Sequence, residues 1–395
     1  MNAPVEHPSR RAVVIVLDGV GIGGAHDASA YGDEGSNTLG NLADAVGGFD
    51  LPHLEALGLG TLAPLAGMRD DLETTGARCV LQPASSGKDS TTGHWELCGV
   101  VLTKPFPTYP QGFPPDVIAE FERRVGRRVL GNVVASGTDV IARFGDEQLQ
   151  DGGLIVYTSA DSVFQVAAHE ESVSLEELYH ACEQARELLA PPHDVSRVIA
   201  RPFAGRSGHF TRTQNRRDFS VQPVAETLLD ALAAAGVART GVGKVDDLFA
   251  GRGISSRHTT DNQDGLRCIQ EWLLSGDGGF LFANLVDFDQ LYGHRNDISG
   301  FYGALRQFDR ALPSLLSALR EDDILFITAD HGNDPTTPST DHARERVPVL
   351  IAGQSVRPVR LAERSTFADL GATAADWFEL SFRGRGESFL PEIAS

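Results

Sequence analysis

Three aspartates and three histidines in this sequence have the types and spacing of ligands for two metal ions. Asp330 and His331 are adjacent, Asp289 and His294 share the short segment DQLYGH, and Asp18 ends an apolar run. Two metals held close together can stabilise both the attacking and the leaving oxygen of an in-line displacement at phosphorus. Mixed carboxylate and imidazole ligands suit manganese or zinc better than magnesium. We therefore predict a two-metal phosphoryl-transfer site with the ligands Asp18, Asp289, His294, Asp330, His331 and His342.

Each of these residues, taken alone, is weak evidence for a metal. A single Asp after a strand more often caps a turn or a helix, and a single His is more often an ordinary core or surface residue. The complete set, at spacings that suit one cluster, is what favours metal binding.

The segment GKDSTTGHWE (87–96) offers hydroxyl groups for the same chemistry. One interpretation is a polar turn that begins a helix, with Ser90 or Thr92 as the N-terminal cap. The other interpretation is a nucleophile, because free N–H groups and the helix dipole favour an approaching phosphate at a helix N-terminus. Coordination to a metal can activate such a hydroxyl. The segment alone leaves both interpretations open.

A basic stretch contrasts with the chain as a whole, which carries a net charge of −20. Residues 197–217 contain no Asp or Glu, and guanidinium groups match phosphate oxygens in bidentate geometry. We expect this stretch to bind a phosphorylated substrate, with Lys244 in GVGKVDD as a weaker candidate. Its arginines are Arg197, Arg201, Arg206, Arg212, Arg216 and Arg217.

The composition excludes several classes of protein. With 34 Lys and Arg against 54 Asp and Glu, the surface repels nucleic acid and anionic membranes, so we expect neither as a partner. No apolar run approaches the roughly 18 residues of a membrane span, and the N-terminus lacks the features of a signal peptide. The four cysteines form no Cys-x-x-Cys pair, which favours reduced, buried thiols. We expect a cytoplasmic protein.

Short apolar runs that end in polar clusters predict the strands that must position these residues. Continuous runs of this kind are typical of strands buried on both faces of a parallel sheet. They alternate with helical patterns at Leu175–Leu189, Pro223–Ala235 and Ser299–Leu319, which indicates an open α/β sheet. Ligands bind such sheets at the carboxyl ends of the strands, where the predicted aspartates fall. The predicted strands are Ala12–Leu17, Leu154–Tyr157, Phe280–Val286 and Ile324–Thr328.

Proline content marks the point where the chain leaves one domain for another. A length of 395 residues allows two or three domains. The segment KPFPTYPQGFPPD (104–116) carries five prolines, which excludes a helix or a central strand there. We predict a catalytic core formed by residues 1–104 and 222–395, with a second domain inserted at 105–221.

Longer motifs are spread over nearly the whole chain. The most specific are GKDSTTGHWE (87–96), TSADSVFQ (158–165) and RVIARPF (197–203). The others are LDGVGIG (17–23), GSNTLGNLA (35–43), LPHLEALGLG (51–60), VDFDQLYGHRND (286–297), ITADHGNDPT (327–336) and STDHARERVP (339–348). Together they resemble the prokaryotic, metal-dependent phosphopentomutases of the alkaline phosphatase superfamily.

The resemblance implies a fold and a metal arrangement. The fold would be an alkaline-phosphatase-like α/β core, with a mostly parallel central sheet flanked by helices, and a smaller inserted α/β cap domain. The resemblance implies two Mn²⁺ ions per chain, with Zn²⁺ or Mg²⁺ as alternatives. One ion would be held by Asp18, Asp330 and His331, and the other by Asp289, His294 and His342.

The resemblance also implies roles in catalysis and substrate binding. Ser90 matches the hydroxyl that is phosphorylated in the family, and because many members have Thr there, Thr91 and Thr92 stay as alternatives. The matching substrate-binding positions are Ser159, Asp161, Arg201, Arg216 and Lys244.

The implied reaction interconverts ribose 1-phosphate, or 2-deoxyribose 1-phosphate, with the 5-phosphate through a phosphoenzyme and a 1,5-bisphosphate. A sugar bisphosphate such as glucose 1,6-bisphosphate would be the activator, and the inserted domain would close to exclude water. The alternatives within the superfamily are a metal-dependent phosphatase or phosphodiesterase, and a phosphoglycerate mutase.

Overall fold

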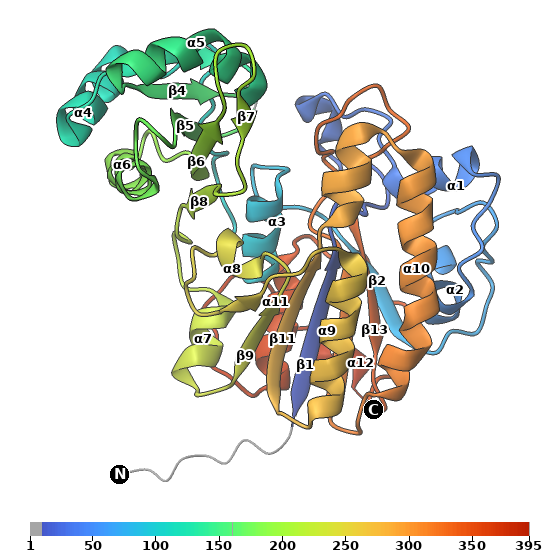
Figure 1. The fold of residues 1–395 in the computed structure, drawn as a ribbon. Coiled ribbons are helices and arrows are strands. Elements are labelled where there is room, and N and C mark those ends of the chain that lie inside the picture. Colours follow the sequence, from blue (N-terminus) through green and yellow to red (C-terminus); the bar gives the residue numbers. More distant parts are fainter. Residues whose placement is uncertain (1–9, 160, 395) are drawn as a thin grey trace, which may run out of the picture. The chain divides into compact units, whose positions relative to one another are not determined.

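The computed structural model describes residues 10–159 and 161–394, which form two compact units (Figure 1). The first unit ends at Lys104 and resumes at Pro223, and the second spans Pro105–Gln222. The second unit is therefore an insertion into the first. Both junctions begin with a proline, a residue that is unfavourable in helix interiors and central strands.

The first unit is built on a sheet whose middle strands are parallel. β1 pairs in parallel with β11 on one side and with β12 on the other, and every residue of these three strands is buried. Burial on both faces explains their continuous apolar sequences. β13 pairs antiparallel with both β12 and β2. The order across the sheet is β10 (Ser256–Arg257), β9 (Arg239–Val242), β11 (Gly279–Leu285), β1 (Arg11–Leu17), β12 (Asp323–Thr328), β13 (Val347–Ala352) and β2 (Ala77–Leu81).

Helices cover both faces of this sheet, with α9 and α10 over one face and α11 over the other (Figure 1). The longer helices are α1 (Thr38–Ala45), α3 (Ser90–Leu97), α9 (Asn262–Ser275), α10 (Ile298–Ser317) and α11 (Ala368–Trp377). The shorter ones are α2 (Pro52–Leu57), α7 (Leu228–Ala234), α8 (Val245–Leu248) and α12 (Leu390–Ile393). Single turns are η1 (Ala28–Tyr31), η2 (Leu59–Thr61), η3 (Phe288–Tyr292) and η4 (Gly293–Arg295).

Helix α7 corrects one prediction, because it begins at Leu228 and the predicted helix began at Pro223. Thr227 and Asp230 form a capping box, in which each side chain accepts a hydrogen bond from the other residue's backbone N–H. This arrangement satisfies the free N–H groups of the first turn and so defines the start of the helix.

The inserted unit is a mixed sheet with helices on both faces. Leu154 and Val156 pack with α4 and α6, whereas Ile155 and Tyr157 pack with α5, as the alternation of side chains along a strand requires. The strand order is β3 (Val129–Val134), β4 (Leu154–Thr158), β5 (Val163–His169), β6 (Arg197–Ala204) and β7 (Thr211–Arg212), and β8 (Arg217–Ser220) also pairs with β6. Its helices are α4 (Pro115–Val125), α5 (Gly137–Asp151) and α6 (Leu175–Leu188).

Two further expectations concern the whole chain. The four cysteines are free and buried, as predicted. Within residues 10–159 and 161–394, no helix has both the length and the apolar character needed to cross a membrane.

Candidate active site

The register of the core sheet brings the predicted ligands to one edge. Leu17 of β1 lies opposite Leu285 of β11, and Val16 lies opposite Thr328 of β12. The three parallel strands therefore end at nearly the same level, and the residues that follow them leave the same edge of the sheet. The residues brought there are Asp18, Asp289, Asp330 and His331.

His331 is the centre of one group of donor atoms. Its Nε2 lies 3.3 Å from Asp18 Oδ1 and 3.5 Å from Asp330 Oδ2. Ser90 Oγ lies 3.1 Å from the same nitrogen. The Nδ1–H group of His331 donates to the carbonyl of Gly332 at 3.0 Å, so Nε2 is left to face the carboxylates. A ring held through its other nitrogen is the usual arrangement of a metal-binding histidine.

Asp289 is the centre of a second group. Its Oδ2 lies 3.1 Å from His294 Nε2, and its Oδ1 lies 3.5 Å from His342 Nε2. His294 donates from Nδ1 to the carbonyl of Thr340 at 2.6 Å, which orients this ring too. The ring centroids of His342 and His331 are 4.3 Å apart, so the two groups adjoin.

Asp289 lies between the two predicted groups of ligands and contributes donor atoms to both. The donor atoms form two overlapping sets, and within each set all the atoms lie within 4.8 Å of one another. Asp289 belongs to both sets. Asp330, which the resemblance places with His331, lies 3.5 Å from His331 Nε2 and also lies beside the fully buried His94, whose Nδ1 is 3.1 Å from Asp330 Oδ2. The two sets are Asp289, His294 and His342, and Asp18, Asp289 and His331.

The cluster holds negative charge away from water. Burial and the neighbouring charge of Asp330 raise the pKa of Asp18. Burial also disfavours the charged form of Asp289, but His342 and His294 hold the pKa of Asp289 well below its ordinary value. The hydrogen bond with Asp289 raises the pKa of His294 to about 9. Buried carboxylates gathered in one place are costly unless cations balance them, so the donor set fits bound metal.

The hydroxyl that faces this cluster from helix α3 is that of Ser90. Ser90 Oγ lies 3.4 Å from Asp18 Oδ1. Thr92 instead donates its hydroxyl to Asp89 at 2.6 Å, and Thr91 is buried. Asp89 also accepts the backbone N–H of Thr92 and is the helix cap. The interpretation in which Ser90 or Thr92 caps the helix is therefore wrong.

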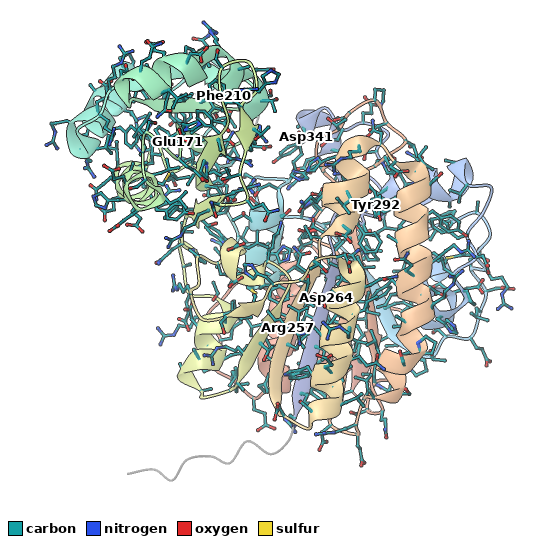
Figure 2. All side chains as sticks on the ribbon, in the orientation of Figure 1. Glu171, Phe210, Arg257, Asp264, Tyr292 and Asp341 are labelled. Atoms are coloured by element: carbon teal, nitrogen blue, oxygen red, sulfur yellow. The ribbon has the colours of Figure 1, made fainter. Side chains whose placement is uncertain are left out.

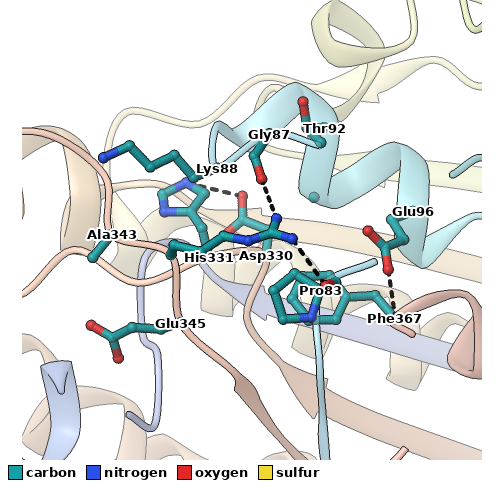
Figure 3. A pocket seen from close by; sticks show the side chains of 12 residues that line it. Pro83, Gly87, Lys88, Thr92, Glu96, Asp330, His331, Ala343, Glu345 and Phe367 are labelled. Carbon is teal, nitrogen blue, oxygen red and sulfur yellow. Dashed lines mark hydrogen bonds and ion pairs between the residues drawn. The ribbon is translucent and has the colours of Figure 1, made fainter. Parts of the chain in front are cut away.

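A buried arginine holds the segment that leads into α3. Arg344 donates to the carbonyls of Ser85 and Gly87, each at 2.6 Å. This segment lines a small pocket together with Asp330 and His331 (Figure 3). The position of the first turn of α3 therefore depends on the segment that carries His342 and Arg344.

Lys88 and Glu345 bind further loops around the site. Lys88 Nζ lies 3.0 Å from Asp33 and 3.3 Å from Asp341, which is labelled in Figure 2. Glu345 is buried and accepts hydrogen bonds from the backbone N–H and the hydroxyl of Thr38. Burial raises the pKa of Glu345. These contacts join the loop after β12 to the N-terminus of α1.

Two predicted substrate residues of the inserted unit, Ser159 and Asp161, contact each other. The backbone N–H of Asp161 donates to Ser159 Oγ at 3.3 Å, and the Ser159 hydroxyl lies 3.5 Å from Asp161 Oδ2. In the first unit, Lys244 Nζ donates to Gln290 Oε1 at 3.0 Å. Gln290 follows Asp289 in the chain, so Lys244 lies at the same edge of the core sheet as the metal-ligand candidates.

The two predicted arginines of the inserted unit have different partners. Arg201 donates from Nε to Gln165 at 3.2 Å, and burial together with the charge of Arg216 lowers the pKa of Arg201 to about 10. A nearby anion would stabilise the charged form of Arg201, which burial and the like charge destabilise. Arg216 is already paired with Asp218 through two hydrogen bonds of 2.7 and 2.6 Å. Asp218 lies just beyond the basic stretch in the sequence and neutralises part of its positive charge. Fewer of these arginines are therefore free to bind a phosphate than the sequence of the stretch suggests.

Three polar side chains at the site were not predicted from the sequence. His94 lies beside Asp330, as described above. Asn284 donates from Nδ2 to Asp18 Oδ2 at 2.8 Å, and Asn333 donates from Nδ2 to Asp289 Oδ1 at 2.6 Å. The sequence carries one signal for them, since Asn284 is a single polar residue in the apolar strand GFLFANL.

The fold and the donor cluster define a class of protein, the metal-dependent enzymes of the alkaline phosphatase type. The family model described as the Metalloenzyme superfamily matches residues 10–382 of the chain. The phosphopentomutase of Carboxydothermus hydrogenoformans is 55% identical over 97% of this chain and 99% of its own length. That of Acetivibrio thermocellus is 53% identical over 97% of this chain and 100% of its own length. The chain belongs to the phosphopentomutase family, whose members are intramolecular phosphotransferases.

A solved structure supports the architecture independently. A phosphoglycerate mutase from Leishmania mexicana aligns with 97% of this chain and 98% of its own, with a TM-score of 0.50 and 13% identity. At that identity the likeness shows the fold alone. The predicted α/β core with a mostly parallel central sheet is confirmed.

Proposed function

We propose that this protein interconverts α-D-ribose 1-phosphate, or 2-deoxyribose 1-phosphate, with the corresponding 5-phosphate. The observation that carries the proposal is the position of the Ser90 hydroxyl, at the start of α3 and within 3.4 Å of donor atoms of His331 and Asp18. Membership of the phosphopentomutase family supports the reaction class, which is transfer of phosphate within one sugar phosphate.

In the proposed reaction Ser90 carries a phosphate at the start of each cycle. The bond between phosphorus and Ser90 Oγ breaks as a bond forms to the free hydroxyl oxygen of the substrate; that hydroxyl loses its proton, Ser90 Oγ gains one, and a 1,5-bisphosphate results. The phosphate at the other position then returns to Ser90 and the product leaves. The free N–H groups and dipole at the start of α3 favour a phosphate at this place. A sugar bisphosphate such as glucose 1,6-bisphosphate would restore phosphate lost from Ser90.

We propose two Mn²⁺ ions as the cofactors, with Zn²⁺ or Mg²⁺ as alternatives. The mixture of imidazole and carboxylate donors supports this choice, and so does the orientation of His331 and His294 by backbone carbonyls. When bound, such ions lower the pKa of an attacking hydroxyl and neutralise charge that develops on the transferred phosphate. The residues proposed to hold them are Asp18, Asp289, His294, Asp330, His331 and His342.

We propose that the remaining phosphate of the substrate is bound by guanidinium and ammonium groups. Arg201 supports this role because no carboxylate of the described residues lies within ion-pair distance of it. Arg216 would share Asp218 with the phosphate or exchange one for the other. The proposed substrate-binding set is Ser159, Asp161, Arg201, Arg216 and Lys244.

A coupled assay tests the proposal directly. The purified protein is incubated with Mn²⁺, glucose 1,6-bisphosphate and ribose 1-phosphate, and both ribose 5-phosphate and free phosphate are measured over time. We expect ribose 5-phosphate to form much faster than free phosphate. If free phosphate forms faster, the protein is a phosphatase, and if neither forms, the proposed activity is wrong.

A further inference from the structure

We propose that Asn284 and Asn333 are positioning residues that set the affinity of the site for divalent metal, an inference that rests on the proposed metal site. Each holds one carboxylate through its side-chain N–H group. Asn284 Nδ2 donates to Asp18 Oδ2 at 2.8 Å, and Asn333 Nδ2 donates to Asp289 Oδ1 at 2.6 Å. The two carboxamides come from separate elements, yet each contacts a different ligand candidate.

Packing alone does not account for these two side chains. Asn284 is 2% exposed in the apolar strand β11, and Asn333 is 0% exposed. The side-chain carbonyl oxygen of each is buried and has no hydrogen-bond partner within the described residues. A buried polar atom without a partner lowers stability, whereas a Leu of similar size would not incur this cost. The hydrogen bond to the carboxylate is therefore the feature that an Asn provides at both positions.

The neighbouring carboxylates determine which way the side-chain amides of Asn284 and Asn333 are turned. Turning either group over would place its carbonyl oxygen against a carboxylate oxygen, and neither atom could donate a hydrogen bond. With Asp18 Oδ2 bound to Asn284, Asp18 Oδ1 faces His331 Nε2 at 3.3 Å. With Asp289 Oδ1 bound to Asn333, Asp289 Oδ2 faces His294 at 3.1 Å. Each Asn thus leaves one carboxylate oxygen directed at an imidazole of the cluster.

The carboxamide of Asn is neutral, and this neutrality also matters for metal binding. A Lys or Arg in either place would neutralise the carboxylate and compete with a metal ion for it. Asn orients the carboxylate and leaves its full negative charge for the cation. Residues that orient metal ligands in this way typically change metal affinity about 10- to 100-fold when they are replaced.

Metal titration tests this role without relying on activity. Asn284→Leu and Asn333→Leu remove the donor with little change in volume. We expect the metal-free variants to bind Mn²⁺ about 10- to 100-fold more weakly than the unchanged protein by isothermal titration calorimetry. The Mn²⁺ concentration for half-maximal rate should rise in parallel. The matched control is Gln148→Leu, which removes a buried carboxamide that bonds to Gly153 and Ser172 in the inserted unit; its Mn²⁺ affinity should not change.

The alanine variants at both positions cover the case in which a Leu variant fails to fold, because they leave space and introduce no misfit. Folded Leu or Ala variants that bind Mn²⁺ as tightly as the unchanged protein would overturn the inference. If the unchanged protein itself binds no divalent metal, the proposed metal site is wrong, and that failure is distinct from a failure of the positioning role.

Discussion

Three hydroxyl residues, Ser90, Thr91 and Thr92, open helix α3, and they differ in what they contact. Ser90 faces the donor cluster, whereas Thr92 bonds to Asp89 and Thr91 is buried. We expect Ser90→Ala to lower kcat by at least about a thousand-fold, as loss of a nucleophile does. Thr91→Val and Thr92→Val should retain far more activity. Mass spectrometry after treatment with glucose 1,6-bisphosphate should find phosphate on Ser90, and phosphate on either Thr would contradict the assignment.

The gathering of Asp18, Asp289, Asp330 and His331 could be predicted from the sequence because these four candidates come soon after apolar strands. Parallel strands end at a common edge, so Asp18 and Asp330 had to lie near each other once β1 and β12 were neighbours. The residues that orient the carboxylates could not be found in this way. His94 lies in a helix and Asn333 in the loop after β12, where polar residues are ordinary, and only the paired distances reveal their contacts.

The start of helix α3 is the element that positions the proposed nucleophile. Asp89→Ala removes the side chain that accepts the N–H and the hydroxyl of Thr92. We expect the free energy of unfolding to fall by about 1 kcal/mol, and kcat to fall as the first turn loosens around Ser90. Asp89→Asn keeps an acceptor and should recover most of both losses. Urea unfolding and steady-state kinetics measure the effects, and an Ala variant as stable and active as the unchanged protein would contradict this role.

Strands β1 and β12 are joined at their first residues by a buried ion pair, at the sheet edge opposite the candidate active site. Arg11 donates from Nε to Asp323 at 2.8 Å and from Nη1 to the carbonyl of Leu273 at 2.7 Å, and both charged side chains are fully buried. Asp323→Ala leaves the guanidinium without its carboxylate.

For this Asp323→Ala variant, we expect the free energy of unfolding to fall by about 3–5 kcal/mol. The double variant Arg11→Met with Asp323→Leu should be much less destabilised, because it leaves no buried charge unpaired. Urea unfolding of both variants provides the comparison. Equal losses in the single and double variants would show that packing, and not the unpaired charge, causes the effect.

The positions of the three middle strands of the core sheet could be predicted because their burial is complete. β1, β11 and β12 are buried on both faces and so appear in the sequence as continuous apolar runs. The start of α7 could not be predicted from periodicity, because the capping box at Thr227 decides it. The direction of β13 could not be predicted either, because a buried strand has the same apolar sequence pattern whether it is parallel or antiparallel to its neighbour.

Metal removal should affect the stability of the whole first unit. The candidate ligands come from segments far apart in the chain, so the unfolded chain cannot present them together. Binding to the folded state alone adds about 2.7 kcal/mol at a metal concentration of roughly 100 times Kd. We expect dialysis against EDTA to lower Tm and added Mn²⁺ to restore it, as followed by scanning calorimetry. A Tm that does not depend on Mn²⁺ would contradict a metal site built from these segments.

The pairing of β1 with strands from the far end of the chain has a consequence for synthesis on the ribosome. β1 ends at Leu17, while its neighbours begin only at Gly279 and Asp323. At a translation rate of about 5–20 residues per second, this apolar strand is without its partners for a time on the order of tens of seconds. The inserted unit, Pro105–Gln222, is complete well before then. The nascent first unit, and not the insertion, is therefore the part that must be kept from aggregating through its unpaired strand.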